Sequence, residues 1–116
     1  MREKAFENKI TKWLVDHGIY KANTPVQNKK VPEQGWYFKM WGGGMSESGI
    51  PDLICNIKGK FVAIEVKGDG GRPSELQIKN IDAINNSGGY GWIPYPKDWE
   101  EFKGNLEKIL DDSRRF

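Results

Sequence analysis

Residues 49–68 read GIPDLICNIKGKFVAIEVKG, and this stretch decides the fold. Residues 53–57 and residues 61–67 are rich in β-branched and aromatic side chains, which favour strands. Residues 58–60 between them, with the sequence KGK, have the composition of a tight turn. The pattern therefore predicts an antiparallel hairpin with strands over 53–57 and 61–67.

Three charged residues gather at the open end of this predicted hairpin. Side chains two residues apart in a strand point to the same face, so Glu65 and Lys67 project together. Asp52 begins the partner strand, and a tight turn at Gly59 brings Asp52 close to Glu65. We therefore expect the three side chains to form one polar patch.

This patch offers the ligands of a hard divalent cation. Mg²⁺ prefers oxygen, which the carboxylates of Asp52 and Glu65 and the backbone carbonyl of Val66 supply. Lys67 would then position a water for attack on phosphorus. A Glu-x-Lys tripeptide is usually only a solvated strand face, but here it ends an apolar strand and precedes a glycine-rich turn into a capped helix. We expect a catalytic Mg²⁺ site in which Mn²⁺ would substitute.

Apolar periodicity and turn residues predict the other elements. The predicted helices cover residues 2–16, 74–86 and a last stretch that carries Trp99, Phe102, Leu106, Ile109 and Leu110; further strands are predicted over 36–41 and 90–93. Residues 19–35 read as a connector with at most a short strand or turn, and Gly42 to Gly49 as a flexible loop.

The order helix, three strands, helix, strand, helix predicts an α/β (α+β) fold, in which a central mixed sheet of about four strands is flanked by helices. A chain of 116 residues has the size of one compact domain. We therefore expect a single domain over residues 1–116.

The composition excludes several classes of protein. With 29% charged residues and no long apolar run, the chain has no predicted membrane span, and its charged N-terminus lacks a signal-peptide pattern. One cysteine, Cys55, and one histidine, His17, cannot build a Cys/His zinc cluster, and the Gly-Lys-Ser/Thr pattern of a P-loop is absent. We expect a cytoplasmic protein, of a bacterium or a phage-infected host cell, with no membrane partner and no nucleotide cofactor.

The segment from Gly49 to Gln77 resembles the PD-(D/E)xK nuclease superfamily and, within it, the stand-alone phage and viral members of the VRR-NUC family. The matches are Asp52 in GIPD, Glu65 and Lys67 in EVKG, Gln77 in SELQ, Gly89 before the last core strand, and Glu7 on the first helix. The resemblance implies a restriction-endonuclease-like core and metal-dependent hydrolysis that leaves a 5′-phosphate. It implies a catalytic set of Asp52, Glu65, Lys67, Gln77 and Glu7, with the metal held by Asp52, Glu65, Val66 and Glu7.

Two of these matches have an ordinary structural alternative. Gln77 lies in a row with Ile81 and Ile84, so its amide points toward the core side, but it would also serve simply to cap its own helix. Glu7 borders the apolar stripe through Ile10 and Leu14, yet periodicity alone fits a plain surface glutamate equally well.

The resemblance implies an endonuclease that is selective for DNA structure, with four-way (Holliday) junctions or related branched DNA as substrate. We expect four basic residues to contact backbone phosphates: Lys58, Lys60, Arg72 and Lys79. Two other readings stay open, namely a catalytically inactive nuclease fold that only binds DNA and a sequence-specific restriction-type endonuclease. Because a junction needs two cuts, we expect a homodimer, with residues 36–41 as its interface.

Overall fold

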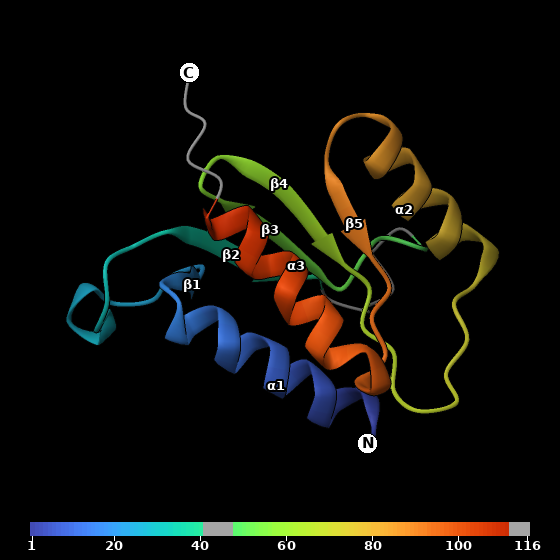
Figure 1. Ribbon diagram of the computed structural model, residues 1–116, viewed down its shortest axis with the longest axis horizontal. Helices are drawn as coiled ribbons and strands as arrows, with labels where there is room; N and C mark the ends of the chain where they lie inside the picture. Colours follow the sequence, from blue (N-terminus) through green and yellow to red (C-terminus); the bar gives the residue numbers. More distant parts are fainter. Residues whose placement is uncertain (41–47, 112–116) are drawn as a thin grey trace.

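The computed structural model describes residues 1–40 and 48–111 and places a mixed sheet at the centre of the chain (Figure 1). Within these residues the sheet has five strands in the order β1-β2-β3-β4-β5. Their bounds are Ile19–Lys21, Gly35–Lys39, Leu53–Ile57, Lys60–Ile64 and Tyr90–Trp92. The two outer pairs, β1 with β2 and β4 with β5, are parallel, and the inner pairs are antiparallel. The prediction of a mixed sheet is confirmed.

The strand β1 lies in the stretch that the sequence predicts to be mainly a connector. It is three residues long, and its first two residues, Ile19 and Tyr20, are buried. Short strands carry little periodicity, so pairing with β2 rather than local pattern fixes this one. The rest of the predicted connector contains only a short 3₁₀ turn, η1 (Val26–Asn28).

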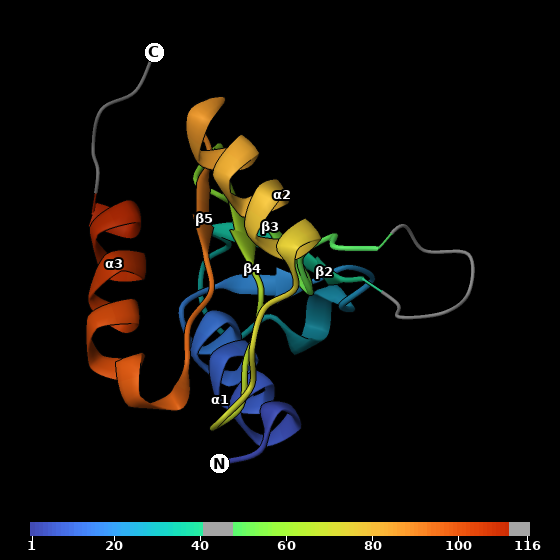
Figure 2. The same ribbon diagram turned by 90° about the vertical axis from the view of Figure 1, so that its right-hand side faces the viewer.

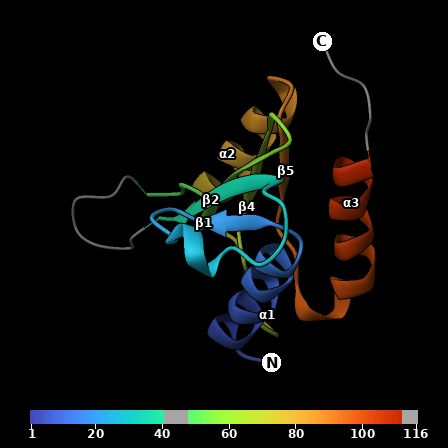
Figure 3. The ribbon, with the colours of Figure 1, turned by 90° about the vertical axis from the view of Figure 1, so that its left-hand side faces the viewer.

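In the described part of the chain three helices cover the two faces of the sheet: α1 (Glu3–Asp16), α2 (Glu75–Asn86) and α3 (Trp99–Asp111), the last preceded by the 3₁₀ turn η2 (Pro96–Asp98). Figures 2 and 3 show α3 on one side of the sheet and α2 on the other. None of the helices in residues 1–40 and 48–111 is long and apolar enough to cross a membrane. The bounds of α1, α2 and α3 confirm the three predicted helices.

The hydrophobic core lies between the sheet and the helices α1 and α3. Helix residues such as Phe6 and Leu106 pack there against Leu53, Val62 and Ile64 of the central strands, all of them fully buried. Cys55 belongs to the same cluster, and burial raises the pKa of its thiol to about 12. Cys55 is therefore a packed residue of the core whose thiol is not ionised at neutral pH.

The hairpin of β3 and β4 is built around the predicted turn. Lys58 and Gly59 both have positive φ, at 51° and 84°, which is the backbone of the two-residue turn that matches the twist of paired strands. The ladder runs from the pair Ile57–Lys60 to the pair Leu53–Ile64. Asp52 and Glu65 are the next residues along each strand, so the register brings them together at the open end.

The strand β4 ends at Ile64, three residues before the predicted end, because the chain leaves β3 there and continues beside β5. The backbone N–H of Glu65 donates to the carbonyl of Trp92 at 2.9 Å, and that of Lys67 donates to the carbonyl of Pro94 at 3.2 Å. The Glu-x-Lys segment is thus held in extended form by the neighbouring chain. The strand predicted over 36–41 ends at Trp41, which lies outside the described residues. Most of the loop predicted from Gly42 to Gly49 lies outside them as well.

Candidate active site

The structure brings Asp52, Glu65 and Lys67 together at the open end of the hairpin. The Asp52 Oδ2 accepts a hydrogen bond of 2.8 Å from the backbone N–H of Val66. The Lys67 Nζ lies 3.4 Å from the Glu65 Oε2, and both side chains are buried, with 9% and 3% of their surface exposed. The polar patch that the spacing predicts is therefore present, with Glu65 and Lys67 buried and Asp52 partly exposed.

Two negative charges are crowded in this patch. The pKa of the Glu65 carboxyl is raised to about 7, first by burial and then by the charge of Asp52, and the ammonium of Lys67 offsets this rise only in part. One ammonium thus does not balance the two carboxylates. A site with this surplus of buried negative charge favours a further cation.

The loop that precedes Asp52 packs against α2. Gly49 has a φ of +83°, and a Cβ on it would lie 2.7 Å from the Cβ of Leu76. The Asn80 side chain donates to the carbonyl of Gly49 at 3.0 Å. Sequence reasoning missed Asn80, although its place on α2 three residues after Gln77, on the same face, is a usable signal.

Glu7 faces the interior, as the resemblance implies, rather than the solvent. Its Oε2 accepts from the Lys39 Nζ at 2.9 Å and from the Lys4 Nζ at 3.2 Å, and its side chain is 9% exposed. Within residues 1–40 and 48–111 no three acidic, histidine or cysteine side chains converge closely enough to hold a metal ion. Glu7 is thus held by two lysines, and its role as a third metal ligand stays a prediction.

Lys39 is the charged residue at this site that the sequence analysis did not single out. The hydrogen bond to Glu7 raises the pKa of its ammonium, and the charge of Asp52 raises it further. The signal was the alternation of the aromatic strand, since Tyr37 faces the core and Lys39 follows it by two. A lysine on a core-facing position needs an acidic partner.

Gln77 is half-buried and forms the capping box of α2. Its backbone N–H donates to the Ser74 Oγ at 3.1 Å, and its Oε1 accepts from the backbone N–H of Ser74 at 2.9 Å. The capping alternative is therefore realised in the structure. The catalytic role of Gln77 stays a prediction carried by the resemblance.

Lys58 and Lys60 lie far from the site, and their contact with DNA phosphates stays a prediction. Both belong to the turn at the opposite end of the hairpin, about 15–20 Å along the strands from Asp52 at roughly 3.3 Å per residue. There the ammonium of Lys58 donates to the carbonyl of Leu110 at 2.7 Å, and that of Lys60 donates to the carbonyl of Ile109 at 3.2 Å. They complement the C-terminal end of α3, where cations are favoured.

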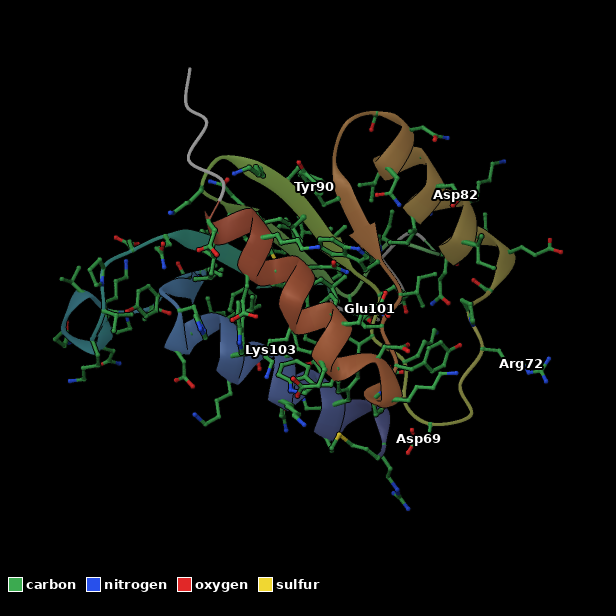
Figure 4. The ribbon with its side chains drawn as sticks, in the orientation of Figure 1. Asp69, Arg72, Asp82, Tyr90, Glu101 and Lys103 are labelled. Carbon is green, nitrogen blue, oxygen red and sulfur yellow. The ribbon has the colours of Figure 1, made fainter. Side chains whose placement is uncertain are left out.

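The two other predicted phosphate contacts, Arg72 and Lys79, are exposed. Arg72 projects outward from the loop that follows the Glu-x-Lys segment (Figure 4). Asp69 of the same loop pairs with the N-terminal amine, and the main chain at Gly68 packs on the first turn of α1, where an added Cβ would lie 2.5 Å from the N of Glu3. The loop thus fixes α1, and with it Glu7, against the end of the Glu-x-Lys segment.

The raised pKa of Glu65 predicts how the stability of the metal-free protein depends on pH. The folded state holds this proton up to about pH 7, whereas the unfolded chain releases it near its ordinary value of 4.5. The contribution of Glu65 to stability is therefore complete below about pH 4.5 and is lost as the pH rises to 7. Thermal unfolding in EDTA should show that Glu65→Gln gains stability relative to the wild type as the pH rises from 5 to 8.

The control for this prediction is Glu101→Gln, which neutralises an exposed carboxylate on α3. It should leave the pH dependence of the melting temperature as in the wild type. A constant difference between Glu65→Gln and the wild type over the whole pH range would contradict the raised pKa.

Comparison with known proteins gives one match. Residues 40–91 match the family model described as VRR-NUC domain, a span that contains Asp52, Glu65, Lys67 and Gln77 and leaves out Glu7. No curated protein and no solved structure matches the chain.

Proposed function

We propose that this chain, whose residues 40–91 match the VRR-NUC domain and whose fold is PD-(D/E)xK-like, is a Mg²⁺-dependent endonuclease that cuts branched DNA, with four-way junctions as the preferred substrate. The observation that carries the proposal is the pair Asp52 and Glu65. Two carboxylates from adjacent strand ends share one patch with Lys67.

The donor set fits a hard divalent cation. Both carboxylates offer oxygen, and burial, followed by the charge of Asp52, raises the pKa of Glu65 to about 7 in spite of the nearby Lys67. Asp52 and Glu65 would hold Mg²⁺, with the Val66 carbonyl as a further ligand. Mg²⁺ bound there would stabilise the charge that develops on the phosphate during hydrolysis.

Val66 and Lys67 would have separate roles around the two carboxylates. The Val66 N–H fixes the orientation of the Asp52 carboxylate through the 2.8 Å hydrogen bond. Lys67, held 3.4 Å from Glu65, would position the attacking water on the phosphorus. The buried setting keeps bulk water away, so that these interactions act at low dielectric.

Selectivity for branched DNA would come from shape. Arg72 and Lys79 are exposed and would contact backbone phosphates, and such contacts orient the duplex without reading its sequence. The enzyme would act in the cytoplasm, where its DNA substrate is found.

One experiment tests the proposal against its alternatives. A supercoiled plasmid, a random linear duplex and a synthetic four-way junction are incubated with the protein in Mg²⁺ and in EDTA. We expect the junction to be cleaved in Mg²⁺ and not in EDTA, and the products to carry 5′-phosphate ends. Binding without cleavage in Mg²⁺ or Mn²⁺ would favour an inactive DNA-binding module, and cuts at one defined sequence of the linear duplex would favour a restriction-type enzyme.

We further propose that the active form is a symmetric homodimer, since resolving a junction takes two cuts and the described residues of each chain form one such patch. The interface candidate is residues 36–41, of which 36–40 are described. β2 lies inside the sheet, so its edges are paired and only its outer face is available. On that face Trp36 is 45% exposed and its ring lies 5.4 Å from that of Phe38, whereas Tyr37 belongs to the core.

The dimer predicts a specific effect of Trp36→Asp. The substitution should turn a dimer into a monomer in light scattering and convert paired cuts in a junction into single nicks, because it buries an unpaired charge in the interface. Val26→Asp, which places the same charge on a residue with 79% exposure in η1, is the matched control. A monomeric wild type at working concentration would overturn the dimer.

A further inference from the structure

Lys39 is the more accessible of two lysines that flank the catalytic patch. The side chain of Lys39 is 37% exposed, whereas that of Lys67 is 9% exposed. The side chain of Lys39 is therefore the one of the two that a ligand from solvent can reach more readily.

The backbone fixes Lys39 beside the first catalytic carboxylate. Lys39 is the last residue of β2 and stands opposite Leu53 in the antiparallel ladder. The next rung is formed by the N–H of Met40, which donates to the carbonyl of Asp52 at 2.7 Å. The ladder thus places the backbone of Lys39 one rung from that of Asp52.

The ammonium of Lys39 has donors to spare. An ammonium has three N–H donors, and in the described part of the chain its one hydrogen-bond partner is the Glu7 Oε2 at 2.9 Å. That bond holds the Nζ in place, because the Glu7 side chain is itself buried on α1. The remaining donors are available to oxygen atoms that arrive from outside.

We propose that Lys39 is a substrate-binding residue, whose ammonium contacts a non-bridging oxygen of the phosphate at the cleavage site, and that Glu7 is the positioning residue that aims it. The inference rests on the proposed function and deepens it, because it names the group that recognises the phosphate. The substrate class is a DNA backbone phosphate seated beside Asp52.

The competing explanation is that Lys39 only neutralises the buried carboxylate of Glu7. The chain supplies a matched control for this alternative, since Lys4 donates to the same Oε2 at 3.2 Å but is 68% exposed and lies on the first turn of α1. Lys4→Gln and Lys39→Gln each remove one ion pair to Glu7. Only the second removes an ammonium from the edge of the patch.

The test is equilibrium binding of a fluorescently labelled four-way junction in EDTA, where no cleavage occurs, over a series of salt concentrations. We expect Lys39→Gln to weaken binding about tenfold, as loss of one charge-assisted contact does. The negative slope of log K against log salt should also become shallower by about 1. Lys4→Gln should bind as the wild type does. Lys39→Arg should restore the salt slope, because it restores the charge.

A second pair of variants protects the test against a folding defect, because Lys39→Gln leaves Glu7 with a weaker set of partners. Glu7→Gln is compared with the double variant Glu7→Gln/Lys39→Gln, in which neither residue carries an unpaired charge. Because Glu7 aims the ammonium, Glu7→Gln should itself weaken binding, and the double variant should bind more weakly still, by less than about tenfold.

The outcomes separate this inference from the proposed function. Equal binding and equal salt slopes for Lys39→Gln and Lys4→Gln, or for the single and double variants, would overturn the role of Lys39 even if the wild type cuts DNA. Failure of the wild type to cut any substrate in Mg²⁺, with the Lys39 effect on binding intact, would overturn the nuclease function and leave the phosphate contact standing.

Discussion

Asp52→Asn and Glu65→Gln are each expected to lower the rate of Mg²⁺-dependent cleavage by at least about a thousandfold. Each substitution removes a charged ligand, and the charge stabilisation supplied through a bound ion is worth several kcal/mol at about 1.4 kcal/mol per tenfold in rate. Single-turnover cleavage of a labelled junction measures the effect. Full activity of either variant in Mg²⁺ would exclude this site.

Both variants should remain folded, for reasons that the contacts supply. The carboxamide introduced by Asp52→Asn keeps a carbonyl oxygen that can accept from the Val66 N–H, whose nitrogen lies 2.8 Å from the Asp52 Oδ2. Glu65→Gln removes a buried charge that burial and Asp52 disfavour. Asp82→Asn on α2 and Glu101→Gln on α3 neutralise exposed carboxylates and are the matched controls (Figure 4). They should cut at the wild-type rate.

Lys67→Ala is expected to slow the chemical step about a hundredfold to a thousandfold, the usual range for a group that assists proton transfer or positions a nucleophile. Binding of the junction in EDTA should change by about twofold or less, because the side chain is 9% exposed and faces Glu65 rather than the surface. Comparing single-turnover rates with binding constants separates the two effects. Equal losses of rate and affinity would make Lys67 a phosphate contact instead.

The same variant should also shift the pH profile. Lys67 is the group that lowers the raised pKa of Glu65, so its removal lets that pKa rise further. A carboxylate must be ionised to bind a cation, so the rate of Lys67→Ala should reach its plateau at a higher pH than that of the wild type. A pH profile that kept its shape would argue against the coupling of the two side chains.

The local pattern of the sequence was sufficient to predict the hairpin and the position of its charged residues. Strand periodicity put Glu65 and Lys67 on one face, and the turn at Gly59 set the register that brings Asp52 to the same end. Both are effects of near neighbours along the chain, which is why sequence alone predicts them. The three helices followed from apolar stripes for the same reason.

Contacts between distant segments decided what the sequence left open or misplaced. Periodicity fitted Glu7 equally well as a surface residue and as a buried one, and its burial depends on Lys39, which is 32 positions away in the chain. Lys58 and Lys60 are near Asp52 in sequence but at the other end of the hairpin, where the end of α3 binds them.

The sequence by itself thus determined which charged residues share the open end of the hairpin, because strand alternation and turn geometry are local. Only the tertiary structure decided which charges face one another. A charge buried next to apolar side chains must find its partner wherever the packing of helices on the sheet places one, and no local pattern records that position. The pairing of Glu7 with Lys39 beside Asp52 is the clearest case in this protein.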